Sequence, residues 1–178
     1  MRLFLAMDLP KEIKDYLFAL ESKVKEAKIT WVSKKNLHIT LKFFGEISEK
    51  DLPKLKDQMK IIHSPLKLSL GQIGFFPNSN NPTVVWVSVE PEEAVIELQQ
   101  KIDAQLLSSF SGEQKFQAHL TLGRIKSIRR KEDFNNSIKS LNIESIPFVI
   151  TSYQLMKSEL TKNGPHYEIL ENVSLSKM

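Results

Sequence analysis

The chain has 178 residues, 41% hydrophobic and 26% charged, which is typical of a globular protein with one sizeable core. Its 25 Lys and Arg against 21 Asp and Glu give a formal net charge of +4, compatible with an anionic ligand but too small to indicate nucleic acid by itself. The absence of Cys excludes disulfides and thiolate chemistry, and no apolar run approaches the roughly 20 residues of a membrane span.

The N-terminal half is predicted to alternate strands and helices. The apolar run 3–7 indicates a buried strand, and it is too short for a signal peptide, so we expect a cytoplasmic protein. Apolar residues then recur at helical spacing from Ile13 to Ala27, which predicts an amphipathic helix. The next predicted elements are a strand at 30–32, a polar turn at 33–36, a strand at 37–44, a helix at 52–62 and a strand at 66–70 extended over 73–76.

The C-terminal half continues this alternation. Residues 77–82 are rich in Pro, Asn and Ser, which predicts a loop joining two strands of a hairpin. The predicted elements that follow are a strand at 84–89, a helix from 91 to about 109, a strand at 116–125, a basic run at 126–131, a helix at 132–141, a strand at 148–155 and, after a turn at Asn163 and Gly164, a strand at 167–175.

One short motif occurs twice. His38 and His119, two of the four histidines in the chain, are each followed by x-Thr-Leu. In a strand the side chains alternate, so His38 would share a face with Thr40, and His119 with Thr121. Two imidazoles and two hydroxyls facing a common cleft would suit acid–base attack at a phosphodiester without a metal ion.

The order of helix, motif strand, helix and strand also occurs twice, with the two histidines at equivalent places. We therefore predict an α+β fold in which residues 1–178 form a single domain of two pseudo-symmetric lobes. Mainly antiparallel sheets would face a central cleft, with helices on the outer faces. A histidine on a strand can instead be purely structural, and a metal site is disfavoured because neither motif has a third ligand nearby.

The chain resembles the two-histidine phosphoesterase superfamily, and within it the LigT-like RNA 2',3'-cyclic phosphodiesterases, also called 2'-5' RNA ligases. The segments that carry the resemblance are 4–10, Trp31 with 36–46, 74–77, 85–86, Phe116 with 119–124, and Ser158, Gly164 and Tyr167.

The resemblance implies a role for each motif residue. His119 would activate water and His38 would protonate the departing 3'-oxygen, which leaves a 2'-phosphate. Thr40 and Thr121 would hold the phosphate, and Arg124 matches an arginine of the family. No cofactor or metal is implied, and the partner would be an RNA end with a 2',3'-cyclic phosphate, acted on by a monomer.

This sequence departs from the family pattern at two positions, since Ala118 replaces a common proline and Lys115 a common arginine. Strict alternation would also put Arg124 on the face of Leu120 and Leu122, and a β-bulge near Gly123 would resolve that conflict.

Aromatic and basic residues outside the motifs indicate further roles. Among the aromatic residues, Phe76 or Phe116 is predicted to stack on a base, although Phe43 and Trp86 are alternatives and such residues are often core. The run from Lys126 to Lys131 could guide an RNA backbone or be a solvated turn. Alternative functions are reverse ligation to a 2'-5' linkage, hydrolysis of a small cyclic nucleotide or an ADP-ribose cyclic phosphate, and a binding module without turnover.

Overall fold

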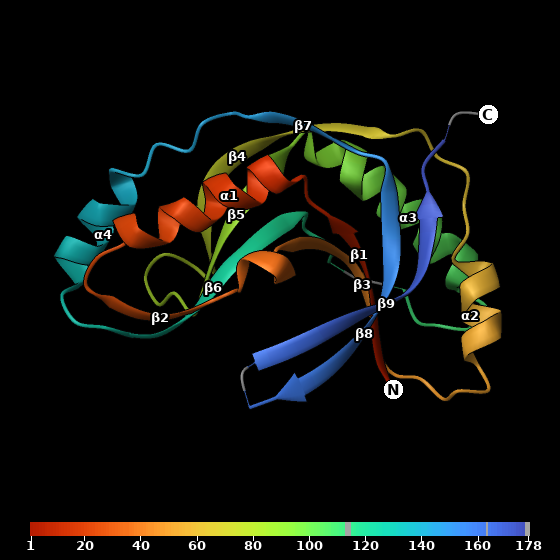
Figure 1. Cartoon of the computed structure of the whole chain (residues 1–178). Coiled ribbons are helices and arrows are strands. Elements are labelled where there is room, and N and C mark those ends of the chain that lie inside the picture. The colour runs from red at the N-terminus through yellow and green to blue at the C-terminus, as the bar shows by residue number, and fades with distance from the viewer. Residues whose placement is uncertain (113–114, 163, 177–178) are drawn as a thin grey trace.

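A computed structural model describes residues 1–112, 115–162 and 164–176. The strands are β1 (Arg2–Asp8), β2 (Ala27–Trp31), β3 (His38–Glu46), β4 (Leu66–Phe76), β5 (Val84–Glu90), β6 (His119–Ile128), β7 (Pro147–Ile150), β8 (Ser152–Thr161) and β9 (Gly164–Ser174). The helices are α1 (Lys11–Leu20), α2 (Leu52–Gln58), α3 (Glu92–Leu106) and α4 (Lys131–Lys139), with 3₁₀ turns at Glu21–Lys23 and Lys34–Asn36. Figure 1 shows their arrangement.

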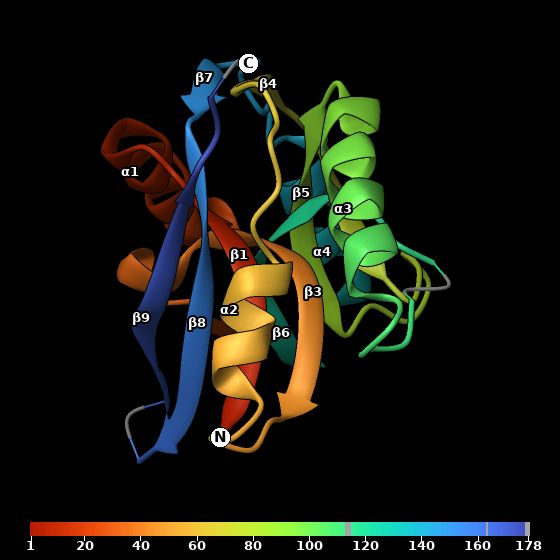
Figure 2. The ribbon, with the colours of Figure 1, turned by 90° about the vertical axis from the view of Figure 1, so that its right-hand side faces the viewer.

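The strands form one antiparallel sheet with the order β7-β4-β5-β6-β3-β1-β8-β9, and β2 pairs with β6 beside this path. We predicted two sheets, and this detail was wrong. The motif strands β3 and β6 join the two halves through a single residue pair, Ile39 and Leu120. On either side of that pair the strands diverge, each toward its own neighbours, which leaves a curled sheet with two halves (Figures 1 and 2).

The predicted order of elements does occur twice. The first set is β1, α1, β3, α2 and β4, and the second is β5, α3, β6, α4 and β8. However, β4 of the first set pairs with β5 of the second, and β8 of the second set pairs with β1 of the first. Each half of the sheet therefore contains a strand from the other set, which interlocks the two halves.

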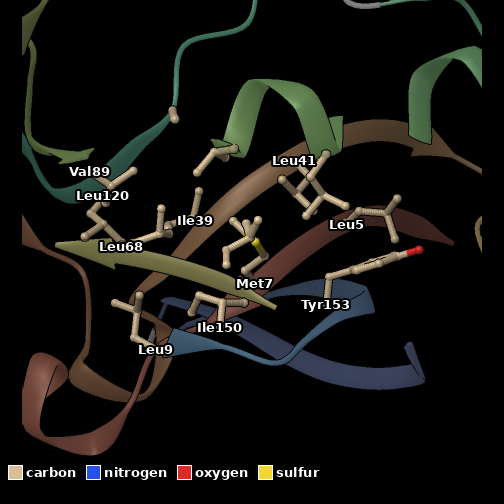
Figure 3. Packing of buried hydrophobic residues seen from close by; sticks show 14 of the residues in the cluster. Leu5, Met7, Leu9, Ile39, Leu41, Leu68, Val89, Leu120, Ile150 and Tyr153 are labelled. Atoms are coloured by element: carbon tan, nitrogen blue, oxygen red, sulfur yellow. The ribbon is translucent and has the colours of Figure 1, made fainter. Parts of the chain in front are cut away.

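Buried side chains from both halves form one hydrophobic cluster. Ile39 lies near Leu120 and Met7 in Figure 3, so the cluster continues across the junction of the motif strands. Helices α1 and α3 add residues such as Ile13 and Leu98 to the same cluster. These helices therefore lie on the face of the motif strands opposite the cleft, as predicted for outer helices.

Several predicted boundaries shift because of pairing that local sequence does not encode. The predicted strand at 148–155 is two strands, since β7 pairs with β4 whereas β8 crosses to β1. The first helix ends at Leu20, and Ala27 instead begins β2 after Glu26, whose φ is 61°. The second motif strand begins at His119 and extends to Ile128, into the basic run. In the predicted turn before β9, Asn163 lies outside the described residues.

A buried ion pair connects the first motif strand to a helix. Lys42 on β3 is 4% exposed, and its Nζ donates to Asp103 Oδ1 on α3 at 2.5 Å and to the Ser111 carbonyl at 2.6 Å. An ammonium removed from water needs such partners, because an unpaired buried charge is strongly unfavourable. The pair thus fixes β3 against α3 on the face opposite the motif side chains.

Replacing Asp103 with Ala is expected to lower the free energy of unfolding by about 3–5 kcal/mol, because the Lys42 ammonium stays buried without its carboxylate. Urea denaturation measures the change. Glu97→Ala is the matched control on the same helix, since Glu97 pairs with Lys101 on an exposed surface, and little change is expected there. Equal effects of the two substitutions would contradict the structural role of the buried pair.

Candidate active site

The two motif strands have the same burial pattern along their first seven residues. His38 and Thr40 are half-buried while Ile39 between them is fully buried, and Leu120 is likewise buried between His119 and Thr121. The predicted division of each strand into a core face and a second face is therefore confirmed. The histidines and threonines lie on the second face.

A β-bulge occurs at the last residue of the second motif. Strand β5 pairs Val85 with Gly123 and Trp86 with Thr121, which leaves Leu122 as an extra residue on β6. The extra residue reverses the alternation, so Arg124 points to the face of Thr121 and lines the cleft. The bulge predicted near Gly123 is therefore present.

The first motif strand has a register shift at the equivalent position. Strand β1 pairs Leu5 with Lys42 and Ala6 with Thr40, which leaves Leu41 as the extra residue. Its consequence is that Phe43, at the position equivalent to Arg124, also faces the cleft.

Both motifs and both residues after the bulges line one cleft of about 710 Å³. The remaining lining residues come from the segment around β2 and the 3₁₀ turn, namely Thr30, Trp31, Val32, Ser33, Lys35 and Asn36, and from the β8–β9 hairpin, namely Leu160, Thr161, Gly164, Pro165, His166 and Tyr167. The cleft size is in the usual range of ligand sites, about 300–1,000 Å³. The structure thus brings together two imidazoles, two hydroxyls and a guanidinium from segments far apart in the chain.

Backbone carbonyls fix the tautomers of both histidines. His38 Nδ1 lies 2.6 Å from the Asn36 carbonyl, and His119 Nδ1 lies 2.8 Å from the Gln117 carbonyl, two residues earlier in each case. A carbonyl can only accept, so each Nδ1 carries a proton and donates it. Each Nε2 is therefore the atom that gains or loses a proton, and one such atom on each strand is available for chemistry.

The two imidazoles differ in their other contacts. His38 Nε2 lies 2.9 Å from Thr40 Oγ1, and the His38 ring contacts Phe4 at 5.2 Å and Tyr167 at 5.6 Å between ring centroids. The His119 ring instead contacts Phe76 at 5.0 Å and Trp86 at 6.0 Å. Two aromatic rings limit the orientation of each imidazole, and in each case they come from strands other than its own.

Burial is the main reason why the pKa of His38 is lowered from its ordinary value of 6.5. The hydrogen bond to the Asn36 carbonyl and the charge of Asp8 act in the opposite direction, while Lys14 and His119 lower the pKa further. An anion bound beside His38 would favour the imidazolium and raise this pKa.

The structure places the two predicted stacking residues differently, with Phe76 beside His119 and Phe116 away from the cleft lining. Phe116 packs against the hydrophobic core and is not among the cleft-lining residues described above. Phe76 stacks on Trp86 at 5.1 Å and contacts His119, so it supports the imidazole rather than presenting a free face. Phe43, weighed only as an alternative, is 63% exposed in the cleft and is the better stacking candidate.

Sequence reasoning missed the contribution of the β8–β9 hairpin. Tyr167 was assigned no contact with His38, and His166 lies on β9 and lines the cleft. The role of the Asn36 carbonyl as the acceptor for His38 was also missed. The Asn36 side chain contacts the hairpin, because its Nδ2 donates to the Pro165 carbonyl at 2.9 Å. The family resemblance marks Asn36 and Tyr167 without giving them a place in the site, and His166 has no sequence signal. The hairpin residues reach the site through the pairing of β8 with β1, which local sequence does not encode.

The described residues contain neither a metal-binding cluster nor a membrane-spanning helix. No group of three or more His, Asp or Glu side chains gathers there in a way that could hold a metal ion. Among the helices in the same residues, none combines the length and apolar character that crossing a membrane requires.

Comparison with known proteins identifies the family. The model of the family described as "LigT like Phosphoesterase" matches the chain twice, at residues 7–86 and 87–167. The chain therefore belongs to the LigT-like phosphoesterase family.

Among its relatives, a protein of Methanocaldococcus jannaschii named "RNA 2',3'-cyclic phosphodiesterase" is 37% identical over 96% of this chain and 99% of its own length. A protein of Thermotoga maritima with the same name is 28% identical over 96% of this chain and 98% of its own length.

Solved structures show the same fold. A protein of Thermus thermophilus superimposes with a TM-score of 0.81 and 27% identity, covering 99% of both chains. Escherichia coli LigT complexed with 3'-AMP superimposes with a TM-score of 0.78 and 26% identity, covering 99% of this chain and 98% of that one.

The contacts of His38 predict its titration. Nitrogen NMR of labelled protein is expected to show Nδ1 protonated at all pH values and Nε2 titrating below pH 6.5, because burial favours the neutral ring. Adding inorganic phosphate should raise this pKa. His63 lies outside the cleft and serves as the control, since its ring nitrogen signals should not respond to phosphate bound in the cleft. A neutral His38 with its proton on Nε2 would contradict the assignment.

Proposed function

We propose that this protein hydrolyses RNA ends bearing a 2',3'-cyclic phosphate and leaves a 2'-phosphate, by acid–base catalysis with two histidines and without a metal ion. The observation that carries the proposal is that two histidines, one from each motif strand, line one cleft. In each ring a backbone carbonyl keeps the proton on Nδ1, which leaves Nε2 for proton transfer. The names of the relatives support an RNA cyclic phosphate as the substrate.

In the proposed reaction, Nε2 of neutral His119 takes a proton from water as its oxygen attacks phosphorus. The bond from phosphorus to O3' breaks, and Nε2–H of protonated His38 gives its proton to O3'. The ring opens to a 2'-phosphate monoester, and each histidine returns to its first state by exchanging a proton with solvent. General acid–base catalysis of this kind contributes about 10²–10⁴-fold per group.

Thr40 and Thr121 are proposed to donate hydrogen bonds to the non-bridging oxygens, where negative charge builds up. Thr40 faces neutral His38 in the free protein, and its hydroxyl donates to Nε2. When substrate binds, the anion would draw a proton onto His38, and the Thr40 hydroxyl would turn from the imidazole to the phosphate. Arg124, which also lines the cleft, adds a fixed positive charge.

Phe43 is proposed to stack on the terminal base, because it is the exposed aromatic ring of the cleft and base stacking on aromatic rings is tolerant of sequence. The cleft is large enough for a nucleotide. Binding of 3'-AMP by Escherichia coli LigT is consistent with a nucleotide in this place. By microscopic reversibility the same groups would also catalyse 2'-5' ligation to a 5'-hydroxyl end.

We further infer that residues 1–178 form one domain of two duplicated units, supported by the two family matches and by the continuous core. The monomeric state, the cytoplasmic location and the independence from cofactors stay predictions.

The decisive assay incubates the protein, in EDTA, with a short RNA ending in 2',3'-cyclic phosphate and separates 2'-phosphate from 3'-phosphate products. We expect the 2'-phosphate, and a loss of about 10²-fold or more in kcat/KM for His38→Ala and for His119→Ala. His63→Ala is the matched histidine control, because His63 lies outside the cleft, and it should retain activity. A 3'-phosphate product, or activity that EDTA abolishes, would overturn the proposal.

The pH dependence follows from the role of His38 as the acid. An acid must be protonated, so kcat/KM should fall as pH rises through the lowered pKa of His38 in the free protein, below 6.5. The corresponding decrease of kcat, which reports the enzyme–substrate complex, should occur at higher pH, because the bound phosphate raises the pKa of His38. A kcat/KM that still rises above pH 6.5 would be incompatible with His38 as the acid.

A further inference from the structure

A basic groove lies beside the proposed active site, between the loop at 77–82 and the end of β6. Its volume is about 430 Å³, and its charged lining residues in the described chain are Lys126, Arg129 and Lys131, with no carboxylate among them. Lys131 Nζ donates to the Asn80 carbonyl at 3.0 Å, which connects α4 to the loop across the groove. Lys126 and Arg129 are exposed. The groove therefore has the charge of an anion-binding surface.

The acidic residues near the groove are occupied by a different arginine. Arg130 Nη2 binds Glu26 Oε1 at 3.0 Å and its Nε binds Asp133 Oδ2 at 3.0 Å. The pKa of Glu26 is lowered chiefly by the hydrogen bond from Arg130, and the charges of Arg130 and Arg129 lower it further. Lys126, Arg129 and Lys131 thus face the groove with an excess of positive charge.

The groove continues the cleft along one strand. Arg124 lines the cleft, and Lys126, two residues further along β6, lines the groove, so the two openings are neighbours along this strand. The loop is held to this part of β6, because the Ile125 amide donates to the Thr83 carbonyl at 2.9 Å. Figure 1 shows β6 extending from the centre of the molecule toward β2 and α4, away from α2.

This end of β6 is on the side of His38. Ile39 pairs with Leu120 in an antiparallel register, so residues after Thr121 on β6 extend past the beginning of β3. Arg124 lines the same cleft as Tyr167, whose ring contacts His38. His38 is the proposed donor to O3', so the ribose of the substrate would lie on this side.

We propose that the basic groove binds phosphates of the single-stranded RNA that leads, in the 5' direction, away from the cyclic phosphate. The inference rests on the proposed function, because it takes the position of the ribose from the role of His38. The groove would give the protein a preference for longer RNA, which the two motifs alone do not supply. Long RNA ends would be better substrates than a cyclic mononucleotide, and the gain would depend on salt.

The test compares Lys126→Ala/Arg129→Ala with wild type on a cyclic mononucleotide and on an RNA of about ten nucleotides with a 2',3'-cyclic end. Each phosphate contact on single-stranded RNA contributes about 0.7 to the slope of log affinity against log salt. Loss of two contacts should reduce that slope by about 1.4. Between about 50 and 200 mM salt, kcat/KM of the wild type on the long RNA should fall about sevenfold more than that of the variant.

The matched control is Lys50→Ala/Lys54→Ala, which removes the same charge from exposed positions. Lys54 lies in α2 and Lys50 just before it, at the end of the molecule opposite α4. It should leave the salt slope unchanged. Fluorescence anisotropy with the same RNA ending in 2'-phosphate provides a second measurement that requires no turnover.

The outcomes separate the two proposals. Hydrolysis of the cyclic mononucleotide without any gain for the longer RNA would support the proposed function and overturn the groove. An equal loss on both substrates for the Lys126/Arg129 variant would also overturn it. RNA binding that weakens in this variant, without hydrolysis of either substrate, would support the groove and overturn the proposed function.

Discussion

The two motif strands meet at one residue pair, Ile39 and Leu120, and the candidate site depends on that contact. Both residues are completely buried, so the hydrophobic core holds the strands together at this point. Since side chains alternate along a strand, burying these two residues necessarily turns the flanking His and Thr residues of both motifs to the opposite face. The strands diverge on either side of the pair, which makes room for a cleft between the two motifs.

The two halves are alike in how they place the catalytic candidates and different in what surrounds them. A bulge occurs at the last residue of each motif, and the residue two positions further faces the cleft, Phe43 on β3 and Arg124 on β6. Directly after the first bulge, Lys42 forms an ion pair with Asp103 on α3. At the equivalent place a Cβ on Gly123 would lie 2.6 Å from Ile29 Cγ2, so glycine allows β2 to approach. One repeat thus supplies an aromatic surface and the other a positive charge.

The two histidines are likewise placed alike but surrounded differently. A carbonyl two residues earlier fixes Nδ1–H in both, so the repeat gives two imidazoles of one tautomer. Their neighbours then make them unequal, because His38 contacts Phe4 and Tyr167 and is hydrogen-bonded to Thr40, whereas His119 contacts Phe76 and Trp86. Acid–base catalysis needs this inequality, since one group must hold a proton while the other lacks one. The basic groove next to Arg124 would extend the same asymmetry to the RNA strand.

The sequence by itself determined the features that depend on local pattern. The repeated His-x-Thr-Leu and its alternation predicted the two motif strands and their core face, helical spacing predicted the long helix now seen at Glu92–Leu106, and Pro and Asn predicted the loop at 77–82. The tertiary structure alone decided that the sheet is continuous, that β7 and β8 are separate strands and that Tyr167 and His166 reach the site. It also decided that Phe43 rather than Phe116 faces the cleft. The reason is that alternation follows from the backbone of one strand, whereas bulges, strand exchange and the hairpin's position depend on partners distant in the chain.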